Sequence, residues 1–387
     1  MMKKALSIIA MSTLVLTLLL TGCGEKDKQT DLAVDKDKGT NVEQDKDKET
    51  EEDKDKETNV EQDKDKETDL EKDKDKKSNF KVSMVTDTGG INDQSFNQSA
   101  WEGLQLAQTE LKILPSFLES TQEADYGPNL EELYDQGNDL IWGIGYLMGD
   151  EVLNAAEINT DKKYAVIDRS FEEAPDNLIG VTFSEQEPSF LVGYIAGKMT
   201  KTNNVGFVGG EEFDVIWRFE SGFRAGVKTA NPDAEIQIQY ANSFVDTPKG
   251  KAIANQMYQN GADIIFHAAG GTGTGVIESA VENGKYVIGV DKDQKAILGK
   301  DEIITSAVKR VDKAIYYVTK DFVDGKWEGG RNINYGLVDG AVGIAPTSSD
   351  AVPEDILKEV EQLEKDIIDG KIIIPKTREE YDELFGE

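Results

Sequence analysis

Residues 85–103 read VTDTGGINDQSFNQSAWEG, and they directly follow the apolar segment FKVSM at residues 80–84. The apolar segment predicts a β-strand, and the amphipathic stretch at residues 99–111 predicts a helix. The loop between them carries two aspartates, two glycines, two asparagines and one phenylalanine. Such a loop can turn sharply and present polar groups together with one aromatic ring. This composition is more typical of a binding site than of a simple connection.

The same strand, loop and helix pattern repeats through the rest of the chain. Short apolar runs that end in Gly, Asp or Asn alternate with amphipathic stretches such as residues 188–200, and the runs include DLIWGIG, KYAVIDR, NLIGVTF, NVGFVGG, ADIIFHAAG and YVIGVD. This alternation predicts parallel sheets with helices on both faces. About 300 residues suit two α/β lobes better than one core. Ligands of such sheets collect at the carboxyl ends of the strands.

The N-terminus predicts export. Lys3 and Lys4 precede the apolar run 5–20, which is too short for a stable membrane span. Small residues then precede Cys23, the only cysteine of the chain. This pattern resembles a bacterial lipoprotein signal, so we expect residues 1–22 to be removed and Cys23 to carry lipid, including palmitate. An ordinary signal peptide with an accidental cysteine is the alternative.

Residues 24–79 have a different composition, in which DKDK recurs from Asp35, Asp45, Asp53, Asp63 and Asp73. Almost nothing in this segment could enter a core, so it is expected to form a disordered, charged tether over residues 23–79. The spacing does not fit a calcium loop, because the sixth position of a loop that begins at Asp35 is Thr40 rather than Gly. Most of the net charge of −32 lies beyond the tether, which argues against a nucleic-acid partner.

Several strand ends carry groups that could hold a polar ligand. In the first loop, Asp87 can accept hydrogen bonds, Asn97 can donate and accept, and Phe96 can cover a flat ring. The alternative is that Asp87 or Asp93 caps the helix and Phe96 belongs to the core. Further candidates at later strand ends are Asp168, Phe244, Gly270, Gly271, Asp291 and Lys309. Lys309 could pair with Asp291, donate to the ligand, or form a surface or hinge salt bridge.

Cofactor and metal sites are not predicted. The glycines of GGTGTGV at residues 270–276 lack the spacing of a dinucleotide-binding loop. The single histidine, His267, falls inside a predicted strand, where a packed neutral imidazole is expected. A histidine-centred triad or zinc cluster is therefore difficult to assemble.

Taken in order, five segments carry a family resemblance: VTDTGGINDQSFNQSAWEG, GGEEFDVIWRFESGFRAG, FVDTPKGK, GADIIFHAAGGTGTGV and GVDKDQ. Together they resemble the basic membrane protein (BMP) family, the purine nucleoside receptor type of substrate-binding lipoprotein of ABC transporters. The resemblance spans residues 79–345. It implies a type I periplasmic-binding-protein fold, with two Rossmann-like lobes joined by three crossover strands. The implied lobes comprise residues 79–185 with 309–333 and residues 186–308 with 334–387.

The resemblance also implies roles for the candidate residues. Phe96 and Phe244 would stack on the base, and Asp87, Asn97 and Asp168 would read its edge. Asp291, Lys309, Gly270 and Gly271 would hold the ribose. Phe213 or Trp217 could replace Phe244 as the second ring. The family more often has Pro where Asp214 stands and a basic residue where Trp217 stands, which leaves the ligand preference open.

The expected function is capture of adenosine, guanosine or inosine and delivery to an ABC permease with its ATPase. The expected place is the extracytoplasmic face of the membrane, through lipid on Cys23, with a Gram-positive surface favoured by the tether. A sugar-binding receptor or a ligand sensor of the same fold is the alternative within the binding class. A nucleoside hydrolase or phosphorylase using Asp87 or Asp168 as a base is a further alternative, but no partner acid, metal cluster or phosphate loop supports it.

Overall fold

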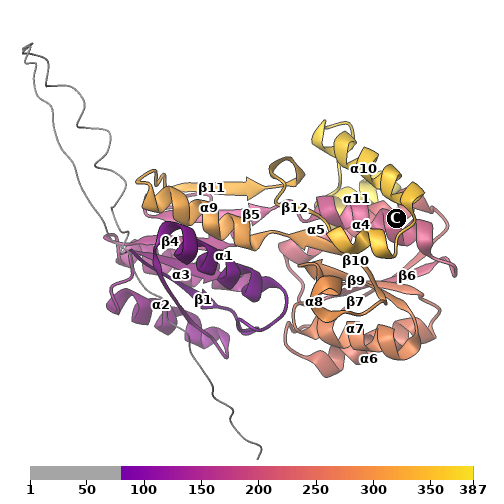
Figure 1. Ribbon diagram of the computed structural model, residues 1–387, viewed down its shortest axis with the longest axis horizontal. Coiled ribbons are helices and arrows are strands. Elements are labelled where there is room, and N and C mark those ends of the chain that lie inside the picture. Colours follow the sequence, from indigo (N-terminus) through magenta and orange to yellow (C-terminus); the bar gives the residue numbers. More distant parts are fainter. Residues whose placement is uncertain (1–79, 387) are drawn as a thin grey trace, which may run out of the picture. The chain divides into compact units, whose positions relative to one another are not determined.

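The computed structural model describes residues 80–386. The predicted signal peptide (1–22), the lipidated Cys23 and the tether (23–79) lie outside the described residues. From Phe80 onward the chain forms two six-stranded sheets with helices around them (Figure 1). None of the helices in this range combines the length and apolar character that a bilayer crossing requires.

The first lobe is built on a sheet with strand order β11-β5-β4-β3-β1-β2. All of its strand pairs are parallel. Its elements are β1 (Lys81–Thr86), α1 (Phe96–Leu111), β2 (Leu114–Leu118), η1 (Glu123–Asp125), α2 (Tyr126–Asp135), β3 (Leu140–Ile144), η2 (Tyr146–Met148), α3 (Gly149–Ile158), β4 (Lys163–Ile167), β5 (Leu178–Phe183), α9 (Val311–Val323) and β11 (Arg331–Tyr335).

The second lobe repeats this topology with strand order β12-β10-β9-β8-β6-β7, and only the β10–β12 pair is antiparallel. Its elements are α4 (Gln186–Met199), β6 (Asn204–Gly209), α5 (Asp214–Ala230), β7 (Glu235–Tyr240), α6 (Thr247–Gln259), β8 (Ile264–Ala268), α7 (Thr272–Asn283), β9 (Tyr286–Asp291), α8 (Gln294–Leu298), β10 (Ile303–Lys309), η3 (Leu337–Asp339), β12 (Val342–Ile344), η4 (Pro346–Asp350), α10 (Glu354–Ile368) and α11 (Arg378–Phe385).

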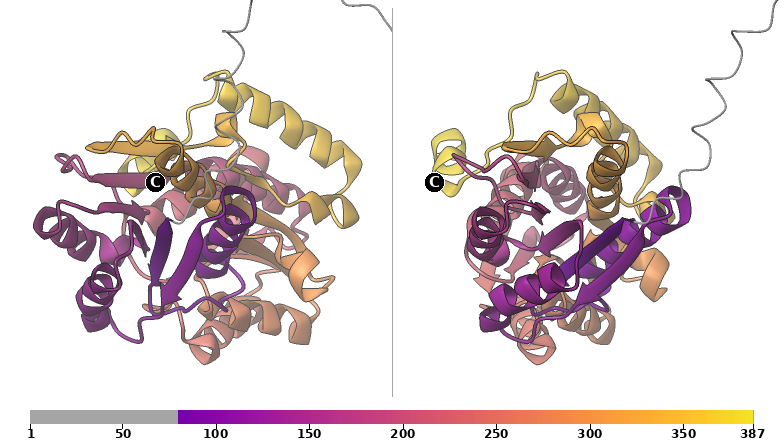
Figure 2. Two further views of the ribbon diagram at one scale, coloured as in Figure 1. Left: turned by 60° about the vertical axis from the view of Figure 1, so that its left-hand side comes forward. Right: turned by 90° about the vertical axis from the view of Figure 1, so that its left-hand side faces the viewer.

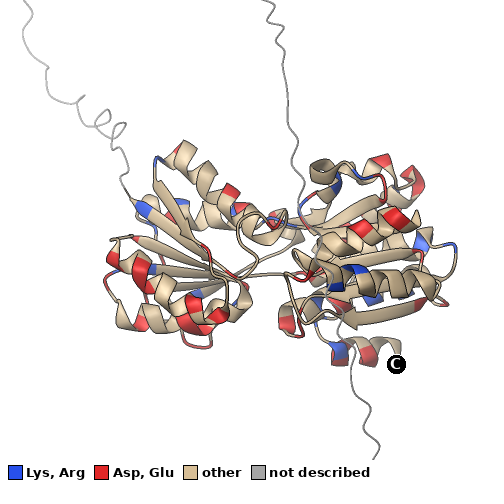
Figure 3. Cartoon of the chain, turned by 90° about the horizontal axis from the view of Figure 1, so that it is seen from below, with Lys and Arg blue, Asp and Glu red and all other residues tan. Residues whose placement is uncertain are grey.

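Three segments pass between the lobes: the β5–α4 junction, the β10–α9 junction and the β11–β12 connection. The prediction of two parallel-sheet α/β lobes is confirmed. The central strands are buried on both faces because helices cover both sides of each sheet, as the views in Figure 2 also show. Aspartate and glutamate residues are distributed over both lobes (Figure 3).

Some element predictions need correction. The helix expected at residues 99–111 begins at Phe96, because Asp93 caps the backbone N–H groups that precede Ser99. Strand β2 was not expected. It contains Pro115 and lies at the edge of its sheet, which is where a strand tolerates a proline.

Candidate functional site

A cavity lies between the lobes at the carboxyl ends of the strands. The strand order reverses between β1 and β3 in the first lobe and between β6 and β8 in the second, and the loops after these four strands all reach the cavity. The cavity is partly open to solvent, and residues of both lobes line it. The structure brings all nine predicted ligand-binding residues to this cavity: Asp87, Phe96, Asn97, Asp168, Phe244, Gly270, Gly271, Asp291 and Lys309.

The loop after β1 is organised by two carboxylates. Asp93 accepts hydrogen bonds from the backbone N–H groups of Ser95 (2.9 Å), Asn97 (2.8 Å) and Gln98 (3.1 Å), and so caps α1. Asp87 Oδ1 accepts from the backbone N–H of Gly89 (2.8 Å) and from Asn97 Nδ2 (2.8 Å). Burial raises the pKa of Asp87 to about 6. The alternative that a carboxylate caps the helix is therefore correct for Asp93, and both Asp87 and Asp93 line the cavity.

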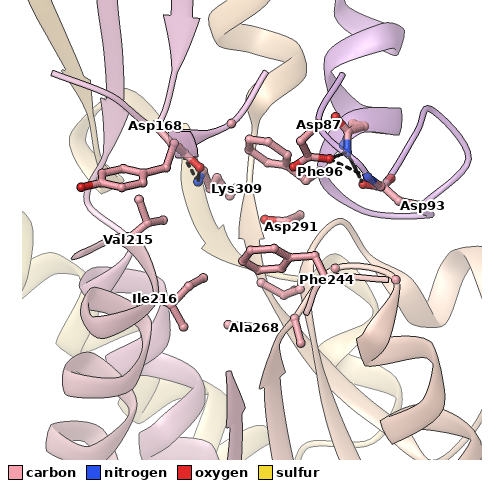
Figure 4. A pocket seen from close by; sticks show the side chains of 18 of the residues that line it. Asp87, Asp93, Phe96, Asp168, Val215, Ile216, Phe244, Ala268, Asp291 and Lys309 are labelled. Carbon is pink, nitrogen blue, oxygen red and sulfur yellow. Dashed lines mark hydrogen bonds and ion pairs between the residues drawn. The ribbon is translucent and has the colours of Figure 1, made fainter. Parts of the chain in front are cut away.

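A buried charge network joins the lobes at the hinge. Lys309, the last residue of β10, donates to both carboxylate oxygens of Asp168 at 2.7 Å (Figure 4). It also lies 3.0 Å from Glu185 Oε1, in the β5–α4 junction. Arg218 of α5 donates to the second oxygen of Glu185 at 2.6 Å. The pKa of Glu185 is lowered although burial opposes this, because both cations favour its charged form.

Asp291, at the end of β9, is held from the opposite lobe. The hydroxyl of Ser95 donates a hydrogen bond to its carboxylate, so the pair spans the cleft. Burial raises the pKa of Asp291 to about 7. Of the two pairings considered for Lys309, the hinge salt bridge is the one that forms, and its partners are Asp168 and Glu185.

Two phenylalanine rings enter the cavity from opposite lobes. Phe96 comes from the start of α1, and Phe244 comes from the loop between β7 and α6 (Figure 4). The expectation that Phe244 closes a strand is wrong: β7 ends at Tyr240, and the chain bends before it reaches Phe244. The backbone N–H of Thr272 donates to the Phe244 carbonyl at 3.0 Å, so the glycine loop positions this ring.

The two residues that could replace Phe244 as the second ring lie in different places. Phe213 lines the cavity and stacks on Tyr146 of the first lobe, with ring centroids 4.6 Å apart and planes 7° apart. Trp217 does not line the cavity, and its ring lies 5.4 Å below the Arg378 guanidinium of α11. The side chain of Trp217 is therefore not a candidate for stacking on the ligand.

The remaining predictions concern His267 and metals. His267 is fully buried in β8, with Nε2 3.0 Å from Gln294 Oε1, and burial lowers the pKa of the imidazole to about 4. This confirms the packed neutral imidazole. Within residues 80–386, no three potential metal-ligating side chains gather at one point.

Sequence reasoning missed Glu185, Ser95 and Tyr146. Tyr146 could have been found, because it follows the predicted strand DLIWGIG and obeys the same strand-end rule as Asp87. Glu185 could have been found in the same way, because it follows the predicted strand NLIGVTF by two residues. Ser95 lies in the first loop, but its pairing could not be predicted because its partner Asp291 lies 196 residues away in the chain.

The sequence and the fold were compared with those of known proteins. The profile of the family described as ABC transporter substrate-binding protein PnrA-like matches residues 80–378. The chain belongs to this family. The resemblance to basic membrane proteins is thus confirmed, and so is the expectation that the protein is not an enzyme, since members of this PnrA-like family are substrate-binding proteins.

Individual relatives agree with this assignment. Basic membrane protein A of Borreliella burgdorferi is 43% identical over 312 residues, which cover 79% of this chain and 91% of that protein. The ABC transporter nucleoside-binding protein BmpA of Lactococcus lactis is 38% identical over 318 residues, covering 77% and 90% of the two chains. A solute-binding protein of an Aeropyrum pernix ABC transporter shares the fold, with a TM-score of 0.70, 29% identity and coverage of 80% and 97%. The PnrA-like family therefore accounts for both lobes.

Proposed function

We propose that this PnrA-like protein captures nucleosides, with purine nucleosides (adenosine, guanosine or inosine) preferred, and delivers them to an ABC permease and its ATPase. The observation that carries the proposal is that Phe96 and Phe244 enter, from opposite lobes, a cavity whose lining also includes four carboxylates and the Asn97 amide. Two rings can hold a flat base by stacking, whichever base it is, and polar side chains can read its edge.

In this proposal each predicted residue keeps its role. Phe96 and Phe244 stack on the base, while Asp87, Asn97 and Asp168 contact its polar edge. Asp291 and Lys309, with the backbone of Gly270 and Gly271, contact the ribose. Asp291 is well suited to accept hydrogen bonds from vicinal hydroxyl groups, because only the Ser95 hydroxyl is seen to donate to it within residues 80–386.

The proposal also places the protein at the membrane. The family consists of ABC transporter components, and the relative from Lactococcus lactis is named for nucleoside binding. We propose anchoring on the extracytoplasmic face through lipid on Cys23, with the tether over residues 23–79 and lobe boundaries near residues 185, 309 and 333. Loss of the protein from the membrane fraction on Cys23→Ser substitution would test the anchor.

The decisive experiment is isothermal titration of residues 79–387, refolded to remove carried-over ligand, against adenosine, guanosine, inosine, cytidine, uridine and ribose. Tight binding of nucleosides but not ribose supports the proposal. Phe96→Ala should then weaken nucleoside binding by about 1–3 kcal/mol, because stacking on one face is lost. A response to ribose alone, unaffected by Phe96→Ala, would instead identify a sugar receptor.

A further inference from the structure

Asn97 is held in one orientation by its neighbours. Its Nδ2 donates to Asp87 Oδ1 at 2.8 Å and to Asp93 Oδ2 at 3.1 Å, so both amide protons are in use. A rotated amide would bring its oxygen against two carboxylates. The amide nitrogen therefore faces the carboxylates, and the amide oxygen Oδ1 lies at the other end of the group.

Asp93 interacts with Asn97 only as a hydrogen-bond acceptor. Its Oδ1 accepts from the backbone N–H groups of Ser95 and Gln98, and its Oδ2 accepts from the backbone N–H and the side chain of Asn97. All four of these contacts come from N–H donors, so Asp93 presents only acceptors. Asp93 is itself only 9% exposed, which keeps this arrangement away from water.

The Asn97 oxygen is left without a partner. Asn97 is 1% exposed and lines the cavity, and its Oδ1 is a buried atom for which no hydrogen bond is found among residues 80–386. Leaving a buried acceptor unpaired is costly, whereas a donor on a ligand would satisfy it.

We propose that Asp93 is a positioning residue that fixes Asn97 as a pure acceptor, so that the site selects bases with an N–H donor on the edge facing Asn97. This inference rests on the proposed nucleoside function and adds a rule for the base. Adenosine, inosine and guanosine satisfy the rule through an amino group or a ring N–H. Purine riboside has the same ring system and ribose, but its base carries no N–H group.

The first test compares ligands on the unmodified full-length chain, refolded after denaturation, by isothermal titration. Purine riboside should bind at least about tenfold more weakly than the tightest of adenosine, inosine and guanosine, because a site built to pair with an N–H group rejects the analogue that lacks it. Tight binding of these three nucleosides with equal affinity for purine riboside would overturn the inference and leave the proposed function standing. No binding of any nucleoside would refute the proposed function itself.

Variants then test which residues produce the preference for these nucleosides over purine riboside. Asn97→Leu keeps the shape of the side chain but removes the acceptor, so the preference over purine riboside should collapse toward equality through weaker binding of the other nucleosides. A preference that persists in Asn97→Leu would overturn the role of Asn97. The comparison on the unmodified chain remains decisive even where this variant does not fold.

Asp93→Asn tests the positioning role, because the new amide can donate to Asn97 Oδ1 and let the Asn97 side chain rotate. In Asp93→Asn, the preference for adenosine, inosine or guanosine over purine riboside should fall, whereas Asp263→Asn should leave this preference unchanged. Asp263 is a matched control: it is 8% exposed, accepts from Thr200 Oγ1 and from the backbone N–H groups of Lys201 and Thr202, and does not line the cavity. An unchanged preference in Asp93→Asn would remove Asp93 from the mechanism.

Discussion

Asp168 and Asp291 share an uncommon backbone conformation. Each directly ends a strand of its lobe, with φ of 71° and 61°, in the left-handed region that non-glycine residues seldom adopt. Each is also more than nine-tenths buried. Strained residues of this kind persist where the surrounding structure holds them, often at functional sites. The conformation turns both carboxylates toward the same cavity from opposite lobes.

The stability of the ligand-free protein should report on Asp291. Burial raises its pKa from the ordinary 3.8 to about 7, so the folded protein keeps the proton to a higher pH than the unfolded chain does. Between these values the contribution of Asp291 to stability falls as pH rises. We therefore expect the free energy of unfolding of Asp291→Asn, relative to that of the unmodified protein, to increase from about pH 4 to about pH 7. The increase should be at most about 1.4 kcal/mol per pH unit, and urea unfolding at several pH values would measure it. A difference independent of pH would show that Asp291 titrates normally.

Lys309 should be much more important for stability than an exposed lysine. Replacing it by Met leaves the buried carboxylates of Asp168 and Glu185 without its charge, which is expected to cost about 3–5 kcal/mol in urea unfolding. Adding Asp168→Asn to Lys309→Met should recover part of the loss, whereas Glu185 keeps its ion pair with Arg218.

The control for this prediction is Lys292→Met. Lys292 pairs with Glu102 across the cleft at 2.5 Å, but the Glu102 side chain is 43% exposed. Its loss should cost less than about 1 kcal/mol. Equal costs at the two lysines would contradict the distinction between the buried and the exposed pair.

At the scale of elements, the sequence predicted most strands because their signal is local. Runs such as ADIIFHAAG are mostly apolar, and parallel strands buried on both faces need that composition. Strand ends, and with them most candidate residues, follow from the same runs. Strand β7 is more exposed than the central strands. Its end was misplaced because the residues before Phe244 are not a continuous apolar run.

Helices α4 and α5 pack unusually closely, and glycines make this possible. A Cβ at Gly226 would lie 2.8 Å from the backbone nitrogen of Tyr194 and closer still to the carbonyl oxygen of Phe190. Helix α5 also carries Val215, Ile216 and Phe219 into the cavity. The packing of these two helices therefore fixes one wall of the site.

Gly226→Ala should destabilise the protein by about 1–3 kcal/mol in urea unfolding, because the backbones of α4 and α5 must separate. The intrinsic preference of helices for Ala over Gly works in the opposite direction, so a loss can only come from the close contact. Gly343→Ala in β12 is the control, since a Cβ there meets nothing within 4 Å. If Gly226→Ala were as stable as Gly343→Ala, the helices would have room that the structure does not show.

At the scale of the whole substrate-binding body, three contacts join the lobes across the cleft. They are the Ser95–Asp291 hydrogen bond, the Glu102–Lys292 ion pair and the Tyr146–Phe213 stack. The sequence could not predict these pairs, because each joins residues from different lobes. The strand-end signals of Asp291 and Tyr146 mark single residues and do not reveal their partners. Ligand binding in such a protein shifts an equilibrium between open and closed forms, and these contacts set where that equilibrium starts.

Phe213→Ser should shift the ligand-free protein toward the open form. The parallel stack of Phe213 on Tyr146 contributes about 0.5–1.5 kcal/mol beyond simple burial, so its loss should lower the closed-to-open ratio by about two- to tenfold. Energy transfer between dyes on cysteines at Glu132 in α2 and Lys249 in α6, in a chain with Cys23 replaced, would measure this ratio. The affinity for ligand should fall by at least this factor where closure is required for binding, because Phe213 also lines the cavity.

Phe117→Ser provides the control for this measurement. Phe117 packs edge-on against Trp101, with centroids 4.9 Å apart, but both residues belong to the first lobe. The substitution is chemically the same and removes a comparable aromatic contact, yet it cannot act across the cleft. Closure should therefore respond to Phe213→Ser and not to Phe117→Ser. If both variants opened the cleft equally, general loosening of the lobes would explain the effect, and the Tyr146–Phe213 stack would have no special part in closure.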